Sequence, residues 1–215
     1  MHLAQPENMN SFKIKIAIAL VVCVFLICSV YVGSAFYIKN VGIELKTDRN
    51  FDYSQDIEYF LQTDSRWANK VMGNSDYTLS QQGCTISNVS MVLNYFGYEV
   101  DPNFLNEKLT QNDAYTENGY LLWFKLEELY PVEYEFKRVF WSGSIENDLE
   151  NGDLPIVRVK YGESEVEHWV LIVGSDGNDF LIMDPLNKDE TLTKLSEYEK
   201  VYAYRSITPK GTRPE

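Results

Sequence analysis

The sequence predicts an α+β domain that follows one apolar helix at the N-terminus. Two observations carry this prediction: apolar residues recur at helical spacing in the first half of the folded part, and its second half holds short β-rich runs separated by turns. A group of helices followed by a group of strands is typical of an α+β domain, and short turns between the strands indicate a mainly antiparallel sheet. Apolar residues form 45% of the chain, which is ample for a packed core.

The helices of the first half are bounded by recognisable local signals. Gly97 is suited to the C-terminal cap of the apolar segment before it, and Asp101 with Pro102 provides an N-cap and a first-turn proline. Pro131 ends a further helical pattern, because proline does not continue a helix. The expected helices are 84–96, a segment starting at Asp101, 120–129, and a segment from Ser144 to Gly152.

Strands are expected in the second half, where β-branched and aromatic residues are frequent. The run from His168 to Val173 is almost continuously apolar, as in a buried central strand. The sequence Ser175-Asp176-Gly177-Asn178 is typical of a turn that leads into the next strand. The expected strands are 132–140, 155–161, 168–173, 180–183 and 200–207.

Residues 16–38 contain no charged side chain. At about 1.5 Å of rise per residue, a helix of this length spans the hydrocarbon core of a bilayer. Cleavable signal peptides have shorter apolar cores of ~7–15 residues, so a retained signal-anchor is favoured, although Gly33-Ser34-Ala35 offers small residues for cleavage. Short N-terminal tails with lysines such as Lys13 and Lys15 usually stay in the cytoplasm, which places residues 1–15 inside and the folded domain outside the cell membrane.

The rest of the chain divides into three parts by composition. Residues 39–55 are polar and mixed and are expected to form a stalk, residues 56–208 form the folded domain, and residues 209–215 have no apolar pattern and are expected to be a flexible tail. The formal net charge is −13. An acidic surface repels phosphate backbones, so we expect no nucleic-acid partner.

Cysteine and histidine are scarce, and their positions restrict the chemistry. Of three cysteines, Cys23 and Cys28 lie inside the apolar segment, so Cys84 is the only thiol of the folded domain. Of two histidines, His2 precedes the apolar segment, so His168 is the only imidazole of the domain. These counts exclude a disulfide within the domain and a zinc site of several Cys or His ligands, and we expect neither metal nor cofactor.

Cys84 follows Gly83 and begins an expected helix, where unpaired backbone N–H groups carry partial positive charge. Such a position favours the thiolate, the nucleophilic form of cysteine. A neutral imidazole such as that of His168 can accept the thiol proton and later protonate a leaving amine. Each residue taken alone also fits a structural role, as a buried inert cysteine or a satisfied histidine.

Asp184 directly follows the expected strand 180–183 and precedes Pro185. If this strand pairs with 168–173 as a hairpin, the outer ends of the two strands meet, and His168 and Asp184 occupy those ends. A carboxylate beside an imidazole orients the ring and stabilises its charged form. The alternative is an ordinary Asp-Pro turn without a catalytic role.

Short motifs around these residues occur in a definite order along the chain. They are Gln62-Thr63-Asp64-Ser65-Arg66-Trp67, Gln82-Gly83-Cys84-Thr85, Met91-Val92-Leu93-Asn94-Tyr95-Phe96-Gly97, Leu154-Pro155-Ile156-Val157, His168-Trp169-Val170 and Asp184-Pro185. The ordered set resembles the peptidase domain related to bacteriocin-processing, double-glycine leader peptidases of the papain superfamily, over roughly residues 57–205. The resemblance implies a papain-like cysteine peptidase fold and a peptide or protein substrate.

The resemblance also implies a Cys–His–Asp triad of Cys84, His168 and Asp184. It further implies an upstream glutamine whose side-chain amide stabilises an oxyanion together with the Cys84 backbone N–H, and Gln62 matches that position best. Two other glutamines, Gln81 and Gln82, are competing candidates, but they lie so close to Cys84 in sequence that both also fit a structural role.

Two departures from the family pattern affect which properties of the family can be expected of this chain. Thr85 stands where the family commonly has glycine, and its β-branched side chain narrows the space beside the thiol. No ATP-binding cassette follows the domain, so a stand-alone hydrolase is expected rather than a dedicated leader peptidase. The hypothesis is a membrane-anchored cysteine peptidase that forms a thioester at Cys84. Acyl transfer to an amine by the same residues, or a non-catalytic extracellular binding module, remains open.

Overall fold

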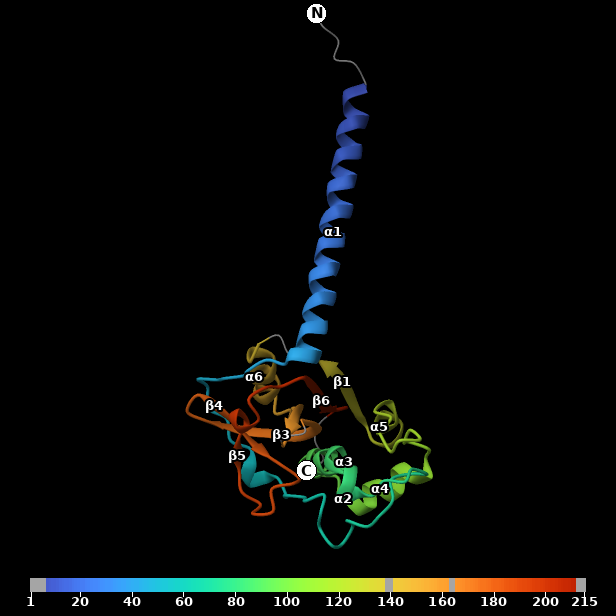
Figure 1. Ribbon diagram of the computed structural model, residues 1–215, viewed down its shortest axis with the longest axis vertical. Helices are drawn as coiled ribbons and strands as arrows, with labels where there is room; N and C mark the ends of the chain where they lie inside the picture. Colours follow the sequence, from blue (N-terminus) through green and yellow to red (C-terminus); the bar gives the residue numbers. More distant parts are fainter. Residues whose placement is uncertain (1–6, 138–140, 163–164, 212–215) are drawn as a thin grey trace, which may run out of the picture.

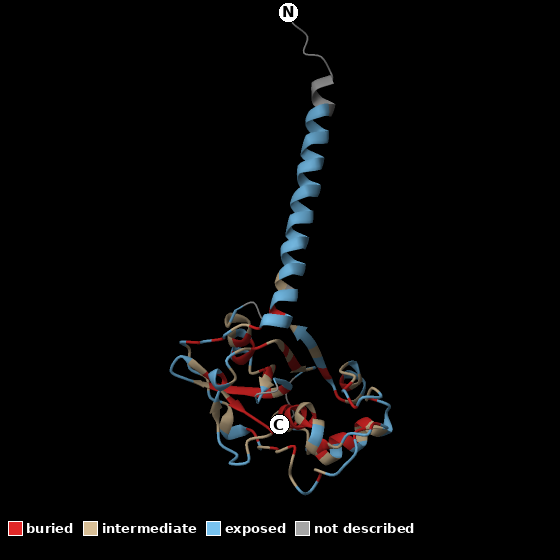
Figure 2. Cartoon of the chain, viewed as in Figure 1, coloured by how far each residue is buried: buried red, intermediate tan, exposed pale blue. Residues whose placement is uncertain are grey.

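A long N-terminal helix, α1 (Glu7–Val41), projects from the rest of the chain in the computed structural model, which describes residues 7–137, 141–162 and 165–211 (Figure 1). The side chains along most of its length are exposed (Figure 2). Within it, the segment Ser11–Val41 is long and apolar enough to cross a membrane, by length and composition alone. This helix contains the predicted span 16–38, whereas part of the predicted tail, residues 1–6, lies outside the described residues.

The segment after α1 lies against the domain, which differs from the stalk expected over residues 39–55. Ile43 forms an isolated β-bridge with Val201 and packs against the hydrophobic core. Asp52 forms a second bridge with Gly174. The sequence pattern did not predict this contact, because the apolar residues of the segment are too widely spaced for a helical or strand period. They nevertheless pack against apolar residues of the folded domain.

Helices are the main regular elements of the first half of the domain. The Asp101 carboxylate caps α4, accepting a hydrogen bond of 2.7 Å from the Phe104 N–H. The expected helix 120–129 begins later, at Phe124, because Leu121 pairs with Tyr115 in a β-bridge. The helical elements are η1 (Ser54–Asp56), α2 (Leu79–Gln82), α3 (Cys84–Tyr95), α4 (Pro102–Gln111), α5 (Phe124–Leu129), α6 (Gly143–Glu150) and η2 (Leu195–Tyr198).

Six strands form one antiparallel sheet in the order β1-β6-β2-β3-β4-β5. The predicted α+β class is therefore confirmed. Residues 138–140 of the first expected strand lie outside the described residues, as do residues 212–215 of the expected tail. The strands are β1 (Val132–Lys137), β2 (Ile156–Tyr161), β3 (Val166–Asp176), β4 (Asp179–Met183), β5 (Thr193–Lys194) and β6 (Ala203–Pro209).

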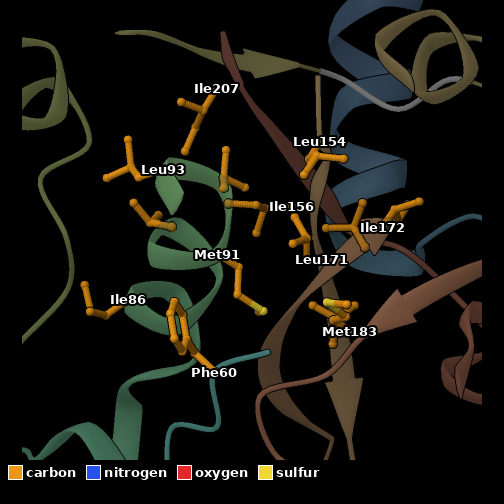
Figure 3. Packing of buried hydrophobic residues seen from close by; sticks show 14 of the residues in the cluster. Phe60, Ile86, Met91, Leu93, Leu154, Ile156, Leu171, Ile172, Met183 and Ile207 are labelled. Atoms are coloured by element: carbon orange, nitrogen blue, oxygen red, sulfur yellow. The ribbon is translucent and has the colours of Figure 1, made fainter. Parts of the chain in front are cut away.

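The core lies between α3 and the sheet. Met91 on α3 points toward the strands that carry Ile156 and Leu171 (Figure 3), and all three side chains are fully buried. Burial of each large apolar side chain of this kind contributes about 1.5–3 kcal/mol. This packing fixes the position of the α3 N-terminus, which begins at Cys84, relative to β3.

Candidate active site

Cys84 is the first residue of α3 and is partly exposed. Gly83 separates it from the short helix α2 and has a φ of −78°, so no left-handed backbone is needed there. The requirement for glycine is steric, since a Cβ atom at position 83 would lie 2.3 Å from the carbonyl oxygen of Leu79. The two helices therefore approach closely enough to present the thiol at a helix start.

The backbone around Cys84 leaves its N–H group without a hydrogen-bond partner among the described residues. In a continuous helix this N–H would bond the carbonyl four residues earlier, that of Ser80. The Ser80 carbonyl instead accepts a hydrogen bond of 2.9 Å from Nε2 of Gln62. Gln62 is buried, and its own backbone N–H donates to the Pro185 carbonyl over 3.0 Å. The Gln62 amide is therefore bound to the backbone of α2, four residues before Cys84.

His168 lies in β3 and is buried. Its Nε2 lies 2.6 Å from Oδ1 of Asp184, and its ring lines the same cavity as Cys84, whose interaction with the ring raises the pKa of His168. Because a carboxylate only accepts hydrogen bonds, Nε2 donates to Asp184 and Nδ1 is the nitrogen that remains for Cys84. Burial lowers the pKa of His168, but the interactions with Asp184 and Cys84 outweigh it and raise the pKa to about 9.

Asp184 follows β4, and the predicted hairpin between β3 and β4 brings it to His168. The Leu186 N–H donates to Oδ1 over 2.8 Å, and the Tyr198 hydroxyl donates to Oδ2. Burial raises the pKa of the Asp184 carboxyl, but the hydrogen bonds with His168, Tyr198 and Leu186 have the larger combined effect and lower it. The carboxylate is therefore ionised at neutral pH, as a partner of an imidazolium must be.

Asn88 ties the nucleophile's helix to the strand of His168. Its Nδ2 donates to the carbonyl of Cys84 over 2.9 Å and to the carbonyl of Trp169 over 2.7 Å. The side chain is fully buried one helical turn after Cys84. Both N–H groups of one amide thus hold the two chain segments that meet in the site.

The three glutamines that the sequence offered have different surroundings in the structure. Gln81 is exposed, and its Oε1 accepts a hydrogen bond of 2.9 Å from the Thr78 N–H, so it caps α2. Gln82 is partly buried beside the thiol, with no hydrogen-bond partner for its Oε1 among the described residues. Among the three, Gln62 is the buried one, and its side-chain amide donates to the Ser80 carbonyl while its backbone N–H donates to the Pro185 carbonyl.

A cavity of about 420 Å³ opens at the thiol. Thr85 lines it, so the side chain that departs from the family pattern faces the same space as the nucleophile. No group of three or more His, Cys, Asp or Glu side chains that could hold a metal ion occurs in the described ranges. The lining residues are Gln62, Gln81, Gln82, Cys84, Thr85, Tyr120, Tyr161, Val166, Glu167, His168, Trp169 and Leu186.

Comparison with known families decides which class this arrangement belongs to. The profile of the Peptidase_C39 like family matches residues 54–209, which is most of the chain. The chain belongs to this family. Membership in the C39-like family points to cysteine peptidase activity, and it confirms the resemblance noted in the sequence.

A solved structure supports the same fold. The crystal structure of a candidate C39-like peptidase from Bacillus anthracis aligns with a TM-score of 0.51 and 16% sequence identity, covering 77% of this chain and 100% of the other. At this identity the likeness concerns the fold alone, which is papain-like as expected. No curated protein sequence matches the chain.

The C39-like site includes two tyrosines that sequence reasoning missed. Tyr198 lies in η2 and bonds the outer oxygen of Asp184. The Tyr59 hydroxyl donates to the Asp184 carbonyl over 2.8 Å and accepts from the Asp184 N–H over 2.9 Å, so it fixes the backbone of that residue. Neither tyrosine stands in a periodic pattern or beside a catalytic motif. With 15 tyrosines in the chain, composition could not single them out.

Proposed function

We propose that the domain is a cysteine peptidase that cleaves peptide bonds through a thioester at Cys84, held at a membrane by α1. The observation that carries the proposal is the position of His168, whose ring forms a hydrogen bond with Asp184 and lines one cavity with Cys84, whose interaction with the ring raises its pKa. A nucleophile, a base and a carboxylate that orients the base are the groups that acyl transfer through a thioester requires. Family membership supports the same reaction class.

In the first half of the reaction, Nδ1 of His168 holds the proton of the Cys84 thiol, and the sulfur attacks the carbonyl carbon of the scissile peptide bond. The carbonyl oxygen becomes negatively charged and accepts hydrogen bonds from the Cys84 N–H and the free N–H of the Gln62 amide. Protonated His168 then gives its proton to the leaving amine, which breaks the C–N bond and leaves a thioester on Cys84.

In the second half, water replaces the departed amine. Nδ1 of His168 takes a proton from the water as its oxygen attacks the thioester carbon. The C–S bond breaks, the new carboxylic acid leaves, and the proton on His168 returns the site to its starting state. Asp184 remains ionised throughout and holds Nε2 by its hydrogen bond, so the ring presents the same edge in both halves.

The anchor proposal is supported by the composition and exposure of α1. Its apolar side chains have no protein partner to cover them over most of the helix, so a bilayer is the environment that suits them. Lys13 and Lys15 at its N-terminal end favour a cytoplasmic start and a peptidase domain outside the membrane. The substrate would then be a peptide or protein segment near the outer membrane surface.

Thiol labelling tests the nucleophile. In a Cys23→Ser/Cys28→Ser background the chain retains Cys84 as its single thiol, so all iodoacetamide incorporation reports on it. We expect labelling near pH 7 at least tenfold faster than that of glutathione, because the paired imidazolium favours the thiolate. The His168→Ala variant should lose this acceleration. Equal labelling rates with and without His168 would refute the proposed pair.

Peptide digestion tests the reaction itself. The same background protein is incubated with a library of random dodecapeptides, and cleavage sites are read by mass spectrometry. We expect cleavage that Cys84→Ala abolishes, while new products formed only with added hydroxylamine or amines would assign acyl transfer instead. A folded protein that neither cleaves nor forms a thioester would be a binding module.

A further inference from the structure

Two arginines from neighbouring strands share one face of the sheet beside the catalytic cavity. Ile156 of β2 pairs with Arg205 of β6, and Arg158 of β2 pairs with Ala203, so the arginine side chains are diagonal neighbours on that face. In a chain with a net charge of −13, a pair of adjacent cations is unusual enough to require an explanation. Neither arginine takes part in the proposed chemistry.

Arg205 is enclosed by aromatic rings rather than by acidic groups. Its guanidinium carbon lies 3.9 Å from the ring centre of Phe136, 5.3 Å from Trp169 and 5.5 Å from Trp123. Among the described residues it forms no salt bridge, and its one hydrogen bond goes from Nη1 to the Tyr204 carbonyl over 3.3 Å. Most of the five N–H donors of this guanidinium therefore have no acceptor in the part of the chain that the structure describes.

Arg158 completes the cationic pair. Its Nη1 contacts Oε1 of Glu167 at 2.5 Å, although the Glu167 side chain is 67% exposed and so is free to move into solvent. Burial and the nearby charge of Arg158 lower the pKa of Arg205 to about 10, which still leaves it charged at neutral pH. An added carboxylate would relieve the repulsion between the two guanidinium groups.

This cationic pair is continuous with the catalytic cavity. Trp169 and Glu167 both line the cavity, and both also contact one of the arginines. Strand β6 is two strands from β3, which carries His168. Arg205 is in register with Leu171 of β3, three residues from His168. The separation therefore combines two strand spacings of about 4.8 Å with about 10 Å along the strand, which roughly four extended residues of substrate bridge.

From this arrangement we infer that Arg205, with Arg158 beside it, is a specificity site for a carboxylate of the peptide substrate about four residues from the scissile bond. The aromatic rings hold the guanidinium in place, so its planar fork is ready to form paired hydrogen bonds with a carboxylate. The inference rests on the proposed peptidase function. The carboxylate can belong to an acidic side chain or to the C-terminus of a short peptide.

The test uses pairs of peptides built on a site that the dodecapeptide library identifies. Each position within four residues of the scissile bond is made Glu in one peptide and Gln in its partner, and each peptide is prepared with a free and an amidated C-terminus. We expect kcat/KM to be about 10- to 100-fold higher for Glu at one position, as for a charged hydrogen bond. A preference that follows the free C-terminus would assign the terminal carboxylate.

Arg205→Gln should remove this preference while cleaving the Gln peptide as well as the parent does, and Arg205→Lys should restore only part of it. Arg49→Gln is the matched control, since Arg49 also lies over an aromatic ring, at 5.4 Å from Phe51, but is already paired with Glu146 and Glu150. A purely structural Arg205 would lower the rates for Glu and Gln peptides equally, which would overturn the inference.

Failure of the peptidase proposal gives a different result. If the parent protein cleaves no peptide, binding of acetylated pentapeptides with a central Glu or Gln to the Cys84→Ala protein is measured by calorimetry. Tighter binding of the Glu peptide that Arg205→Gln abolishes would support the carboxylate site without catalysis. Equal binding of the two peptides, or cleavage that prefers neither Glu nor a free C-terminus, would exclude it.

Discussion

The imidazole of His168 donates from Nε2 to Oδ1 of Asp184 over 2.6 Å, and both side chains are buried. This contact and the interaction with Cys84 raise the pKa of His168 to about 9 against the effect of burial. In a His2→Gln background His168 is the only histidine, so its NMR signals report this value alone. We expect the titration midpoint near 9 and an activity that declines as the pH rises through it. A midpoint near 6.5 would contradict the proposed pair.

The same shift predicts how stability depends on pH. A pKa raised from 6.5 to about 9 on folding contributes stability that is fully present below pH 6.5 and is lost as the pH rises through 9. The loss amounts to at most about 3 kcal/mol in the free energy of unfolding, at 1.36 kcal/mol per pKa unit. Urea unfolding between pH 6 and pH 10 measures it. In Asp184→Asn, which lacks the carboxylate, this dependence should largely disappear.

Tyr198 is predicted to act as a positioning residue for Asp184. Its hydroxyl donates to Oδ2, and this hydrogen bond is one cause of the lowered pKa of Asp184. Tyr198→Phe should raise that pKa and reduce kcat about tenfold, the value of a hydrogen bond to a charged group, with little change in KM. Tyr77→Phe alters an exposed tyrosine and is the control. An unchanged acidic limb of the pH–rate profile would argue against the role.

Asn88 should matter for stability and activity together. Its two N–H groups satisfy the carbonyls of Cys84 and Trp169, so Asn88→Ala leaves buried acceptors unpaired and costs about 2–3 kcal/mol. Asn88→Asp should cost more, because a carboxylate cannot donate to either carbonyl. The control is Asn94→Ala, at a half-buried position of the same helix. Urea unfolding with parallel kcat measurements checks the prediction, which fails if Asn88→Ala and Asn94→Ala behave alike.

Substitutions of Gln62 and Gln81 are predicted to have different effects on kcat. Gln62→Ala removes an oxyanion donor and should lower kcat by about 10²–10³-fold, with KM little altered. Gln81→Ala removes a cap of α2 and should lower stability by about 1 kcal/mol, with a much smaller effect on kcat. Steady-state kinetics and thermal unfolding of the two variants decide between them. A larger kcat loss in Gln81→Ala would transfer the oxyanion role to that residue.

The N-terminal helix leads to a prediction about the mature protein. If α1 is retained as an anchor, intact mass spectrometry of the membrane fraction finds the chain with residues 16–38 still attached. Extraction at alkaline pH should leave it in the membrane pellet, since a spanning helix is not released by charge disruption. A secreted chain that begins near Gly33-Ser34-Ala35 would show that the segment is a cleaved signal.

Local sequence patterns predicted the elements that local forces form. The cap at Asp101 and the apolar face of residues 84–96 suffice to place α4 and α3, because helix boundaries depend on neighbours within one turn. The helix expected from residue 120 starts at Phe124 instead, because Leu121 is paired with Tyr115 in a β-bridge and is therefore not helical. That bridge has no signature in local periodicity.

By itself the sequence determined the α+β class, the apolar N-terminal helix and the identity of the single thiol and single imidazole in the domain, because counts and periodicity do not depend on folding. Only the tertiary structure decided which other groups support that pair. Tyr59 and Tyr198 come from a loop and a short helix far from Cys84 in sequence, and the fold brings both to Asp184. Such contacts arise from the whole fold, so no short stretch of residues encodes them.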